Sequence, residues 1–398
     1  MMKINLLLSI IATLISNLSF GQANIIDSIV HQSYQRKFTV HTPTGFTNTT
    51  PVSAVLMLHG NGGTMQNSQN FTNLNSVSNT NGFLAVYPEG YGIVSSGGFS
   101  WADSRGTSAD IAGIDDLGFI NKLLDTLLAN YNIDTNKIYI CGFSNGGYMT
   151  QRFACEQNQR FAAMASLGSI MDTSLYSSCN PQRPIPMMFV IGTADPFVPF
   201  NGGVANGSGG LVNQIINADT LVDFWKTNNN CLQTNPPISL PDIDLTDNST
   251  VTLFNFTNCS CNSDVKFYRV NGGGHTWPGV EIPLYEIIAG ETNEDIQASV
   301  ELWNFFNAHT LCNITVGIDE QTIRPTIKIY PNPARTELYL CISQTDKSEI
   351  LVSNLLGQVL IKTQNQNLID ISNLTNGIYM ITITQGQIKQ TQKFIKEQ

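Results

Sequence analysis

The segment GFSNGG, residues 142–147, presents a serine in a pattern suited to nucleophilic chemistry. An apolar run, KIYIC, precedes this segment, and a helical pattern, YMTQRFACE, follows it. Between a strand and a helix, the pattern G-x-S-x-G forms a sharp turn that exposes the serine hydroxyl, here that of Ser144. Such a hydroxyl attacks an acyl carbon once a base removes its proton. The alternative is a serine with a purely structural role in the turn.

Ser144 needs a base to take its proton and an acid to orient that base. We predict His275 as the base, because it lies in NGGGHTWPG, a glycine-rich loop after the last predicted strand of the large domain. Hydrolases with this kind of turn carry nucleophile, acid and histidine in that order along the chain. Asp195 fits the acid, since it follows the apolar run MMFVIG and precedes a proline. The competing acids in predicted loops or helices are Asp172, Asp219 and Asp223.

Acyl transfer also needs N–H donors for the negative oxygen that develops on the substrate. We expect one donor from the backbone of Asn145, the residue after the serine. The second is expected from HGNGG, residues 59–63, which follows an early strand. Asn61 is the first candidate in this segment and Gly62 is the next. The side chain of His59 is predicted to brace the segment, with a catalytic base as the alternative.

Two tryptophans lie close to these motifs. Trp277 comes two residues after His275, and Trp101 lies in a loop rich in glycine and serine. Exposed indole rings stack on sugars or aromatic acyl groups, so both are candidate substrate contacts. The alternative for each is an anchor within its loop. The remaining histidines, predicted to be structural or exposed, are His31, His41 and His309.

The elements that position these residues alternate between strands and helices. Buried strands are predicted from the apolar runs SAVLMLHG, FLAVYPEG, KIYICGFS, MMFVIGTAD and VKFYRVNGGG. Residues 115–131 place apolar side chains three and four positions apart, as one face of a helix requires. Asp115 and Asp116 are predicted to cap that helix, and residues 223–225 and 296–306 indicate further helices. We predict an α/β fold with a mostly parallel sheet, helices on both faces, and chemistry at the carboxyl ends of the strands.

The end of the chain has a different character. From about residue 325, short alternating apolar runs are separated by the turn clusters YPNPA, NLLGQ and NLTNG. This pattern predicts a small C-terminal β-sandwich. A length of 398 residues also suits one large domain and one small one.

The beginning of the chain predicts export. A basic Lys3, the apolar run at 6–15 and small residues before Gln22 form the pattern of a secretory signal peptide cleaved after Gly21. The alternative is a membrane anchor, but a span needs about 20 apolar residues. We therefore predict a signal peptide at residues 1–21, a catalytic domain at 22–312, a linker at 313–324 and a β-sandwich at 325–398.

Eight cysteines in an exported chain favour disulfides. Cys141 in an apolar strand and Cys341 in the tail are predicted to be buried thiols. We favour a Cys155–Cys179 bridge, which would tie the end of one helix to the loop after the next strand. The six candidates for bridges are Cys155, Cys179, Cys231, Cys259, Cys261 and Cys312. Zinc is the competing interpretation, but the C-x-C spacing at 259–261 is shorter than zinc motifs prefer.

The composition limits the class of partner. Twenty basic against thirty acidic residues give a net charge of -10, which repels nucleic-acid backbones. Hydrophobic residues make up 42% of the chain, enough for a sizeable core. We expect no cofactor, no metal and no nucleic-acid partner, and a monomeric protein.

Seven blocks of the large domain, in order, resemble the secreted polyhydroxybutyrate depolymerase-like and feruloyl esterase-like branch of the α/β-hydrolases. They are HGNGG, YPEG, FSWADSRG, DDLGFI, GFSNGGYM, GTADPFVP and GGGHTWPG. The resemblance implies acyl-ester hydrolysis, with Ser144, Asp195 and His275 as the triad. It covers both polyester depolymerases and esterases that remove feruloyl or acetyl groups from plant polysaccharide.

The tail resembles the C-terminal sorting domain of type IX secretion, found on cargo proteins of one Gram-negative bacterial phylum. The matching blocks are IKIYPNPA, SNLLGQVL, ISNLTNGIYMITI and a basic end at residues 393–396. The resemblance implies recognition by the secretion machinery of the outer membrane, then release or attachment to the outer cell surface. The alternative is an accessory substrate-binding β-sandwich.

Together these patterns lead to the hypothesis of a secreted serine esterase. Feruloyl or acetyl esters on plant cell-wall polysaccharide are the preferred substrates, and polyhydroxybutyrate is the alternative. A serine peptidase and a non-catalytic adhesin on the same fold are weaker hypotheses. The first would need a propeller domain or a basic site for the peptide terminus, and the second conflicts with an intact set of catalytic residues.

Overall fold

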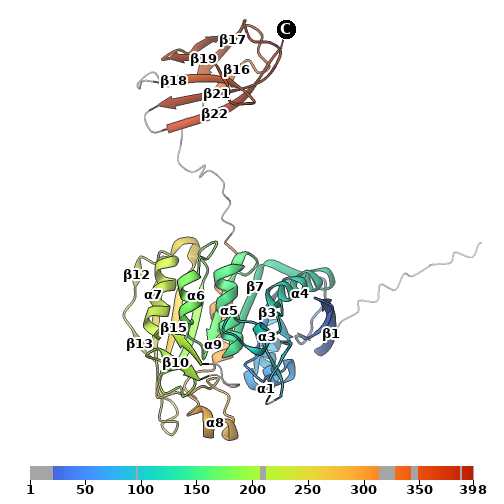
Figure 1. The fold of residues 1–398 in the computed structure, drawn as a ribbon, viewed down its shortest axis with the longest axis vertical. Coiled ribbons are helices and arrows are strands. Elements are labelled where there is room, and N and C mark those ends of the chain that lie inside the picture. Colours follow the sequence, from blue (N-terminus) through green and yellow to red (C-terminus); the bar gives the residue numbers. More distant parts are fainter. Residues whose placement is uncertain are drawn as a thin grey trace, which may run out of the picture. The chain divides into compact units, whose positions relative to one another are not determined.

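The computed structural model describes residues 21–95, 97–206, 212–312, 328–341, 348–385 and 388–397. The chain divides between residues 314 and 315 into two compact units, each of which is drawn in Figure 1. Of the predicted signal peptide only residue 21 is described, and the predicted linker at 313–324 lies outside the described residues. No helix within the described ranges is long and apolar enough to cross a membrane.

The large unit alternates strands and helices, as the sequence predicts. Its strands are β1 (Ala23–His31), β2 (Tyr34–Thr42), β3 (Val52–Leu58), β4 (Leu84–Pro88), β5 (Gly92–Ile93), β6 (Phe99–Ser100), β7 (Ile133–Phe143), β8 (Ala163–Leu167), β9 (Met187–Gly192), β10 (Gly203–Asn206), β11 (Val212–Ile215), β12 (Gln233–Thr234), β13 (Ile238–Ser239), β14 (Thr250–Thr257) and β15 (Val265–Asn271). Its α-helices are α1 (Met65–Thr72), α2 (Leu74–Asn81), α3 (Ser108–Ile111), α4 (Asp116–Asn130), α5 (Asn145–Glu156), α6 (Thr173–Ser178), α7 (Ala218–Asn228), α8 (Pro283–Ala289) and α9 (Ala298–Asn307). Two short 3-10 helices are η1 (Asn158–Arg160) and η2 (Ser260–Asn262).

Eleven of the described strands form one sheet, in the order β1-β2-β4-β3-β7-β8-β9-β15-β14-β12, with β13 also paired to β14. The six central strands from β4 to β15 run parallel, and the outer pairs are antiparallel. This is the mostly parallel sheet that the sequence predicts. Because parallel strands need crossover connections, the helices cover both faces of this sheet.

Strand β7 shows how the two faces of the sheet are packed. Ile138 and Ile140 belong to one buried cluster, which includes residues of α4, α5 and α7. Tyr139 and Cys141 belong to a second cluster, which includes residues of α2 and α9. Successive side chains of a strand point to opposite faces, so β7 is buried on both sides. The strand that ends at the predicted nucleophile is therefore held at the centre of the core.

The small unit contains two sheets. Its strands are β16 (Lys328–Tyr330), β17 (Glu337–Cys341), β18 (Ser348–Asn354), β19 (Val359–Gln364), β20 (Leu368–Asp370), β21 (Gly377–Gln385) and β22 (Ile388–Lys396). The orders are β16-β17-β20 and β19-β18-β21-β22. Leu338 of the first sheet and Ile350 and Ile381 of the second share one buried cluster, so the sheets pack face to face. This is the predicted β-sandwich.

Three disulfides join the six predicted cysteines among the described residues: Cys155–Cys179, Cys231–Cys259 and Cys261–Cys312. The pairing favoured from the sequence, Cys155–Cys179, is present. Cys141 is a buried free thiol, and the side chain of Cys341 lies outside the described residues.

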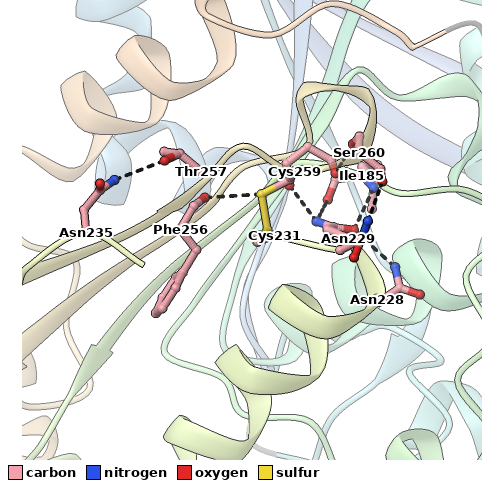
Figure 2. Close-up of a disulfide and its surroundings, with 11 residues drawn as sticks. Ile185, Asn228, Asn229, Cys231, Asn235, Phe256, Thr257, Cys259 and Ser260 are labelled. Atoms are coloured by element: carbon pink, nitrogen blue, oxygen red, sulfur yellow. Dashed lines mark hydrogen bonds between the residues drawn. A yellow bond between two sulfur atoms is a disulfide. The ribbon is translucent and has the colours of Figure 1, made fainter. Parts of the chain in front are cut away.

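The Cys231–Cys259 bridge lies beside an asparagine that joins three segments of the chain (Figure 2). The Asn229 side chain accepts a hydrogen bond from the Ile185 N–H at 3.1 Å and donates one to the Ile185 carbonyl at 2.7 Å. The Ser260 N–H donates to the Asn229 carbonyl at 2.9 Å. The bridge and these bonds hold the end of α7 against the start of β9 and the connection before β15.

A buried ion pair fixes the start of α4. The Arg36 guanidinium of β2 donates to the Asp116 carboxylate, and the two side chains are 1% and 0% exposed. Asp116 also accepts a hydrogen bond from the Ala102 N–H at 2.7 Å. Only Asp115 caps the helix, by accepting from the Gly118 N–H. The prediction that both acids cap α4 is therefore wrong for Asp116. Its side chain points inward, because it is buried in the pair with Arg36.

We expect Asp116→Leu to lower the free energy of unfolding by about 3–5 kcal/mol, because it leaves the Arg36 guanidinium buried without its partner. Urea unfolding followed by tryptophan fluorescence measures this in the full chain, since the four tryptophans at 101, 225, 277 and 303 all belong to the large unit. The matched control is Asp125→Ala, which removes a 71% exposed carboxylate from its pair with Arg160. Exposed pairs contribute at most about 1 kcal/mol. Equal losses for the two variants would contradict the interpretation.

Candidate active site

Ser144 occupies a tight turn between β7 and α5. Its backbone angles are φ 53° and ψ -119°, in a region that non-glycine residues rarely adopt. The turn needs glycines on both sides: a Cβ at Gly142 would lie 2.2 Å from the Gly146 carbonyl carbon, and one at Gly146 would lie 2.3 Å from the Leu58 carbonyl oxygen. Strand, helix and neighbouring strand are thus in backbone contact, and the serine is held at the end of the sheet.

Asp195 and His275 form a buried pair at the ends of β9 and β15. The imidazole Nδ1 and the carboxylate Oδ2 are 2.6 Å apart, and the side chains are 4% and 0% exposed. The other carboxylate oxygen accepts hydrogen bonds at 2.8 Å from the N–H groups of Phe197 and Val198. With Oδ1 occupied by two backbone donors, the carboxylate is fixed in rotation and holds the imidazole in one orientation. The competing acids do not contact the imidazole: Asp172 caps α6, while Asp219 and Asp223 lie on α7.

Ser144 and His275 line one cavity of about 280 Å³. The imidazole packs between the rings of Phe143 and Phe197, whose centroids are 4.8 and 5.3 Å from its own. A second cavity of about 610 Å³ shares Asn61, Phe143 and further lining residues with the first. The structure therefore brings the three predicted residues to one end of the sheet, where two cavities meet. Among the described residues, the imidazole is hydrogen-bonded to Asp195.

The segment at residues 59–63 lines both cavities. Asn61, the first candidate for an oxyanion donor, lies on the walls of both. The prediction of Gly62 as the alternative donor is wrong, because the Gly62 N–H already donates to the Phe99 carbonyl at 2.9 Å. Asn145 is the first residue of α5, a position at which the N–H has no partner within the helix.

His59 braces this segment, as predicted. Its Nε2 accepts a hydrogen bond from the Gly90 N–H at 2.9 Å, so the ring proton lies on Nδ1, which is 2.7 Å from the Gly60 carbonyl oxygen. Burial lowers the pKa of His59 to about 4. The ring is therefore neutral at physiological pH and links two loops at the rim of the cavity.

The expectation that Trp101 and Trp277 expose their rings to substrate is wrong. Both side chains are 0% exposed, and neither lines a cavity described above. The Trp101 indole N–H donates to the His59 carbonyl at 3.0 Å, so this ring anchors its loop. Trp277 packs edge-on against Phe71 and Phe143 beneath the site. Residue type indicated contact with substrate, but tertiary packing turned both rings into the core.

A polar network next to Ser144 was not predicted. The Asn145 side chain accepts from the Trp101 N–H at 2.7 Å and donates to the Asp103 carboxylate at 2.6 Å. Arg105 donates to the same carboxylate through Nε at 3.0 Å and Nη2 at 2.7 Å. Burial raises the pKa of Asp103, and the neighbouring Arg105 opposes that shift. The block FSWADSRG contains Trp101, Asp103 and Arg105, but nothing in its spacing shows that Asp103 reaches the residue after the serine.

Two family models match separate parts of the chain. Residues 47–220 match the family model described as phospholipase/carboxylesterase, and residues 328–397 match the secretion system C-terminal sorting domain. The chain is a carboxylic ester hydrolase of the α/β-hydrolase fold. Its small unit is a sorting domain of the kind that the tail resembles.

Relatives of the hydrolase are distant in sequence. One is "Putative esterase NocK" of Nocardia uniformis subsp. tsuyamanensis, 28% identical over 61% of this chain and 71% of that protein. Another is the bifunctional acetylxylan esterase/xylanase XynS20E of Neocallimastix patriciarum, 29% identical over 41% of this chain. The match spans only 22% of that longer protein. A third is feruloyl esterase C of Emericella nidulans, 25% identical over 54% of this chain and 69% of that protein.

In the parts of the hydrolase that the structure describes, no group of three His, Cys, Asp or Glu side chains is arranged to hold a metal ion.

The buried His59 makes stability depend on pH with a definite sign. Its pKa is about 4 in the folded protein, against an ordinary value of 6.5, so between these pH values the unfolded chain binds a proton that the folded chain does not. The contribution of neutral His59 to the free energy of unfolding is therefore fully present above pH 6.5. This contribution falls as the pH is lowered towards 4. Over this range we expect the wild type to lose up to about 3 kcal/mol more than His59→Gln, which keeps a donor and an acceptor at this position. Urea unfolding at several pH values measures the difference, and parallel pH profiles would refute it.

Proposed function

We propose that this hydrolase is a secreted serine esterase in which Ser144, His275 and Asp195 act as a triad. The observation that supports this most strongly is the buried Asp195–His275 pair at the wall of a cavity that Ser144 also lines. A carboxylate held by two backbone N–H groups fixes the tautomer and orientation of an imidazole, which is what a general base beside a serine requires.

The reaction proceeds through an acyl-enzyme. His275 takes the proton of the Ser144 hydroxyl as its oxygen attacks the ester carbonyl, and the Asp195 carboxylate stabilises the imidazolium that forms. The same imidazole then returns the proton to the leaving alcohol. Water repeats the sequence in reverse, so that the acid is released and Ser144 is restored.

The oxyanion is held by the backbone N–H groups of Asn145 and Asn61. The Asn145 N–H lies at the beginning of α5, where the helix dipole favours negative charge. Asn61 borders the same cavity as Ser144 and Asn145, next to Gly60. A Cβ at Gly60 would lie 3.4 Å from the Ser144 Cβ, so this segment approaches the nucleophile closely.

The substrates that we propose are feruloyl or acetyl esters on plant cell-wall polysaccharide. Two of the relatives are named as an acetylxylan esterase and a feruloyl esterase, which supports this class. The sorting domain supports export by type IX secretion, to the medium or to the outer cell surface, where a polymer is accessible. We further propose that the hydrolase acts as a monomer.

One observation favours the alternative substrate, a polyester such as polyhydroxybutyrate. Helix α8 exposes Leu284, Ile287 and Ile288, at 84%, 78% and 61%. Ile288 and the neighbouring Tyr285 also line the smaller cavity. An apolar rim of this kind would adsorb a hydrophobic polymer surface.

We expect Ser144→Ala to lower turnover of nitrophenyl acetate by about 10⁴-fold or more, because the covalent step is lost. A fluorophosphonate probe should label the wild type and leave this variant unlabelled. Ser177→Ala, on the exposed side of α6, is the matched control and should be labelled like the wild type. Labelling of Ser144→Ala would remove this serine from the mechanism, and hydrolysis of casein but not of esters would favour a peptidase.

The substrate class is tested by supplying methyl ferulate, acetylated xylan and a polyhydroxybutyrate film to the same enzyme preparation. We expect hydrolysis of one or both of the first two, with little release of hydroxybutyrate from the film. The polyester alternative would be established instead if the wild type released hydroxybutyrate from the film, the Ile287→Ser variant released less, and methyl ferulate was not hydrolysed.

A further inference from the structure

Arg105 is a charged residue in the wall of the cavity that contains Ser144 and His275. Its side chain is only 7% exposed. Burying a guanidinium is unfavourable unless its donors are satisfied. Arg105 has no role in the proposed acyl-enzyme mechanism, so its position in the wall needs another explanation.

Two contacts fix the position of this guanidinium. Nε and Nη2 both donate to the Asp103 carboxylate, and the group lies over the ring of Tyr148 at 3.4 Å from the centroid. An arginine carries five N–H donors in a rigid fork. The third nitrogen, Nη1, donates to no residue that the structure describes. The wall of the cavity therefore offers hydrogen-bond donors whose direction is already set.

The guanidinium is also fixed relative to the nucleophile. Tyr148 lies one helical turn after Ser144, and its N–H donates to the Ser144 carbonyl at 2.9 Å. One turn of helix rises about 5.4 Å. Asp103 accepts a second hydrogen bond from the side chain of Asn145, the next residue after the serine. A group bonded to the serine can thus meet Arg105 at a defined distance.

The charges around Arg105 determine what it can bind. Asp103 balances its charge through direct hydrogen bonds, and Asp172 also interacts electrostatically with it. Together the two carboxylates and the guanidinium leave no net positive charge to attract an anion. The remaining N–H donors therefore suit an uncharged oxygen, such as a hydroxyl or methoxy group, better than a carboxylate.

We propose that Arg105 donates a hydrogen bond through Nη1 to an uncharged oxygen on the acyl group of the substrate. This rests on the proposed function, since it assumes that Ser144 forms the acyl-enzyme. The acyl group occupies the cavity of about 280 Å³, and a polymeric alcohol extends through the adjoining cavity of about 610 Å³, which is the larger of the two. Arg105 is thus a specificity residue that separates oxygenated acyl groups from their deoxy counterparts.

Two pairs of esters test the proposal on the full-length chain. Methyl 4-hydroxycinnamate and methyl cinnamate differ by one distal hydroxyl, as do nitrophenyl 3-hydroxybutyrate and nitrophenyl butyrate. A site built to donate to an oxygen rejects the analogue that lacks it, so the wild type should favour the hydroxylated member of one pair by about 10- to 100-fold in kcat/KM. The pair that shows the preference identifies an aromatic or a short aliphatic acyl group.

Arg105→Lys should bring that ratio close to one, because lysine retains the charge beside Asp103 but loses the planar fork. Each ratio is taken within one variant, so a partial loss of folded enzyme cancels. The double variant Asp103→Asn/Arg105→Met should give the same ratio without leaving a buried charge unpaired. Arg269→Lys is the matched control, since Arg269 lies 5.1 Å from the centroid of the Phe254 ring and lines neither cavity.

Three results would overturn the proposal: a wild type without preference in either pair, a ratio unchanged in Arg105→Lys, or faster hydrolysis of methyl 4-carboxycinnamate than of the hydroxylated ester. Failure of the proposed function looks different. In that case the wild type and Ser144→Ala would hydrolyse nitrophenyl acetate at the same rate, whatever the ratios.

Discussion

The closeness of β7, α5 and β3 is the constraint on which the site depends. At Gly142 and Gly146 no Cβ can be accommodated, because backbone atoms of the facing element lie within about 2.3 Å of where it would be. The chain can make this approach only by placing Ser144 at positive φ, a conformation that costs on the order of 1–3 kcal/mol. Burial of α5 on nearly every face offsets that cost, since residues such as Met149 and Phe153 are fully buried. The position of Ser144 at the wall of the cavity is therefore a consequence of core packing.

A second constraint is the set of charged groups on and around the loop between β6 and α3. Asp116 holds the Ala102 N–H, and Arg152 of α5 donates to the Ala102 carbonyl. One residue further on, Asp103 connects Asn145 to Arg105. A buried carboxylate with several charge-assisted hydrogen bonds fixes its partners in direction as well as in distance. The loop is thus held to α5 and to β2 together, and the wall of the cavity is determined by the same groups that position the turn.

The sequence was informative where local pattern and chain order carry the signal. Apolar runs predicted β3, β4, β7, β9 and β15, and the order of serine, acid and histidine selected three residues that the fold places at one end of the sheet. Strand β8, AMASL, was not predicted, because it lacks the β-branched residues that favour strands and is defined by its pairing with β7 and β9. The burial of Trp101, the bond that occupies the Gly62 N–H and the reach of Asp103 to Asn145 all depend on contacts between distant segments. The spacing of residues along the chain does not predict such contacts.

The arrangement separates chemistry from recognition. Ser144, Asp195 and His275 are attached to strand ends or to the turns directly after them, and the sheet fixes their relative positions. The walls around them come from other segments: Arg105 from a loop, and Tyr285 and Ile288 from α8. Substitutions in those segments change the shape, polarity or charge of a cavity without moving Ser144 or His275. A distant relative can therefore retain the residues at the strand ends and act on a different ester. Under the proposed function, the residues of the walls, and not those of the proposed triad, select the substrate.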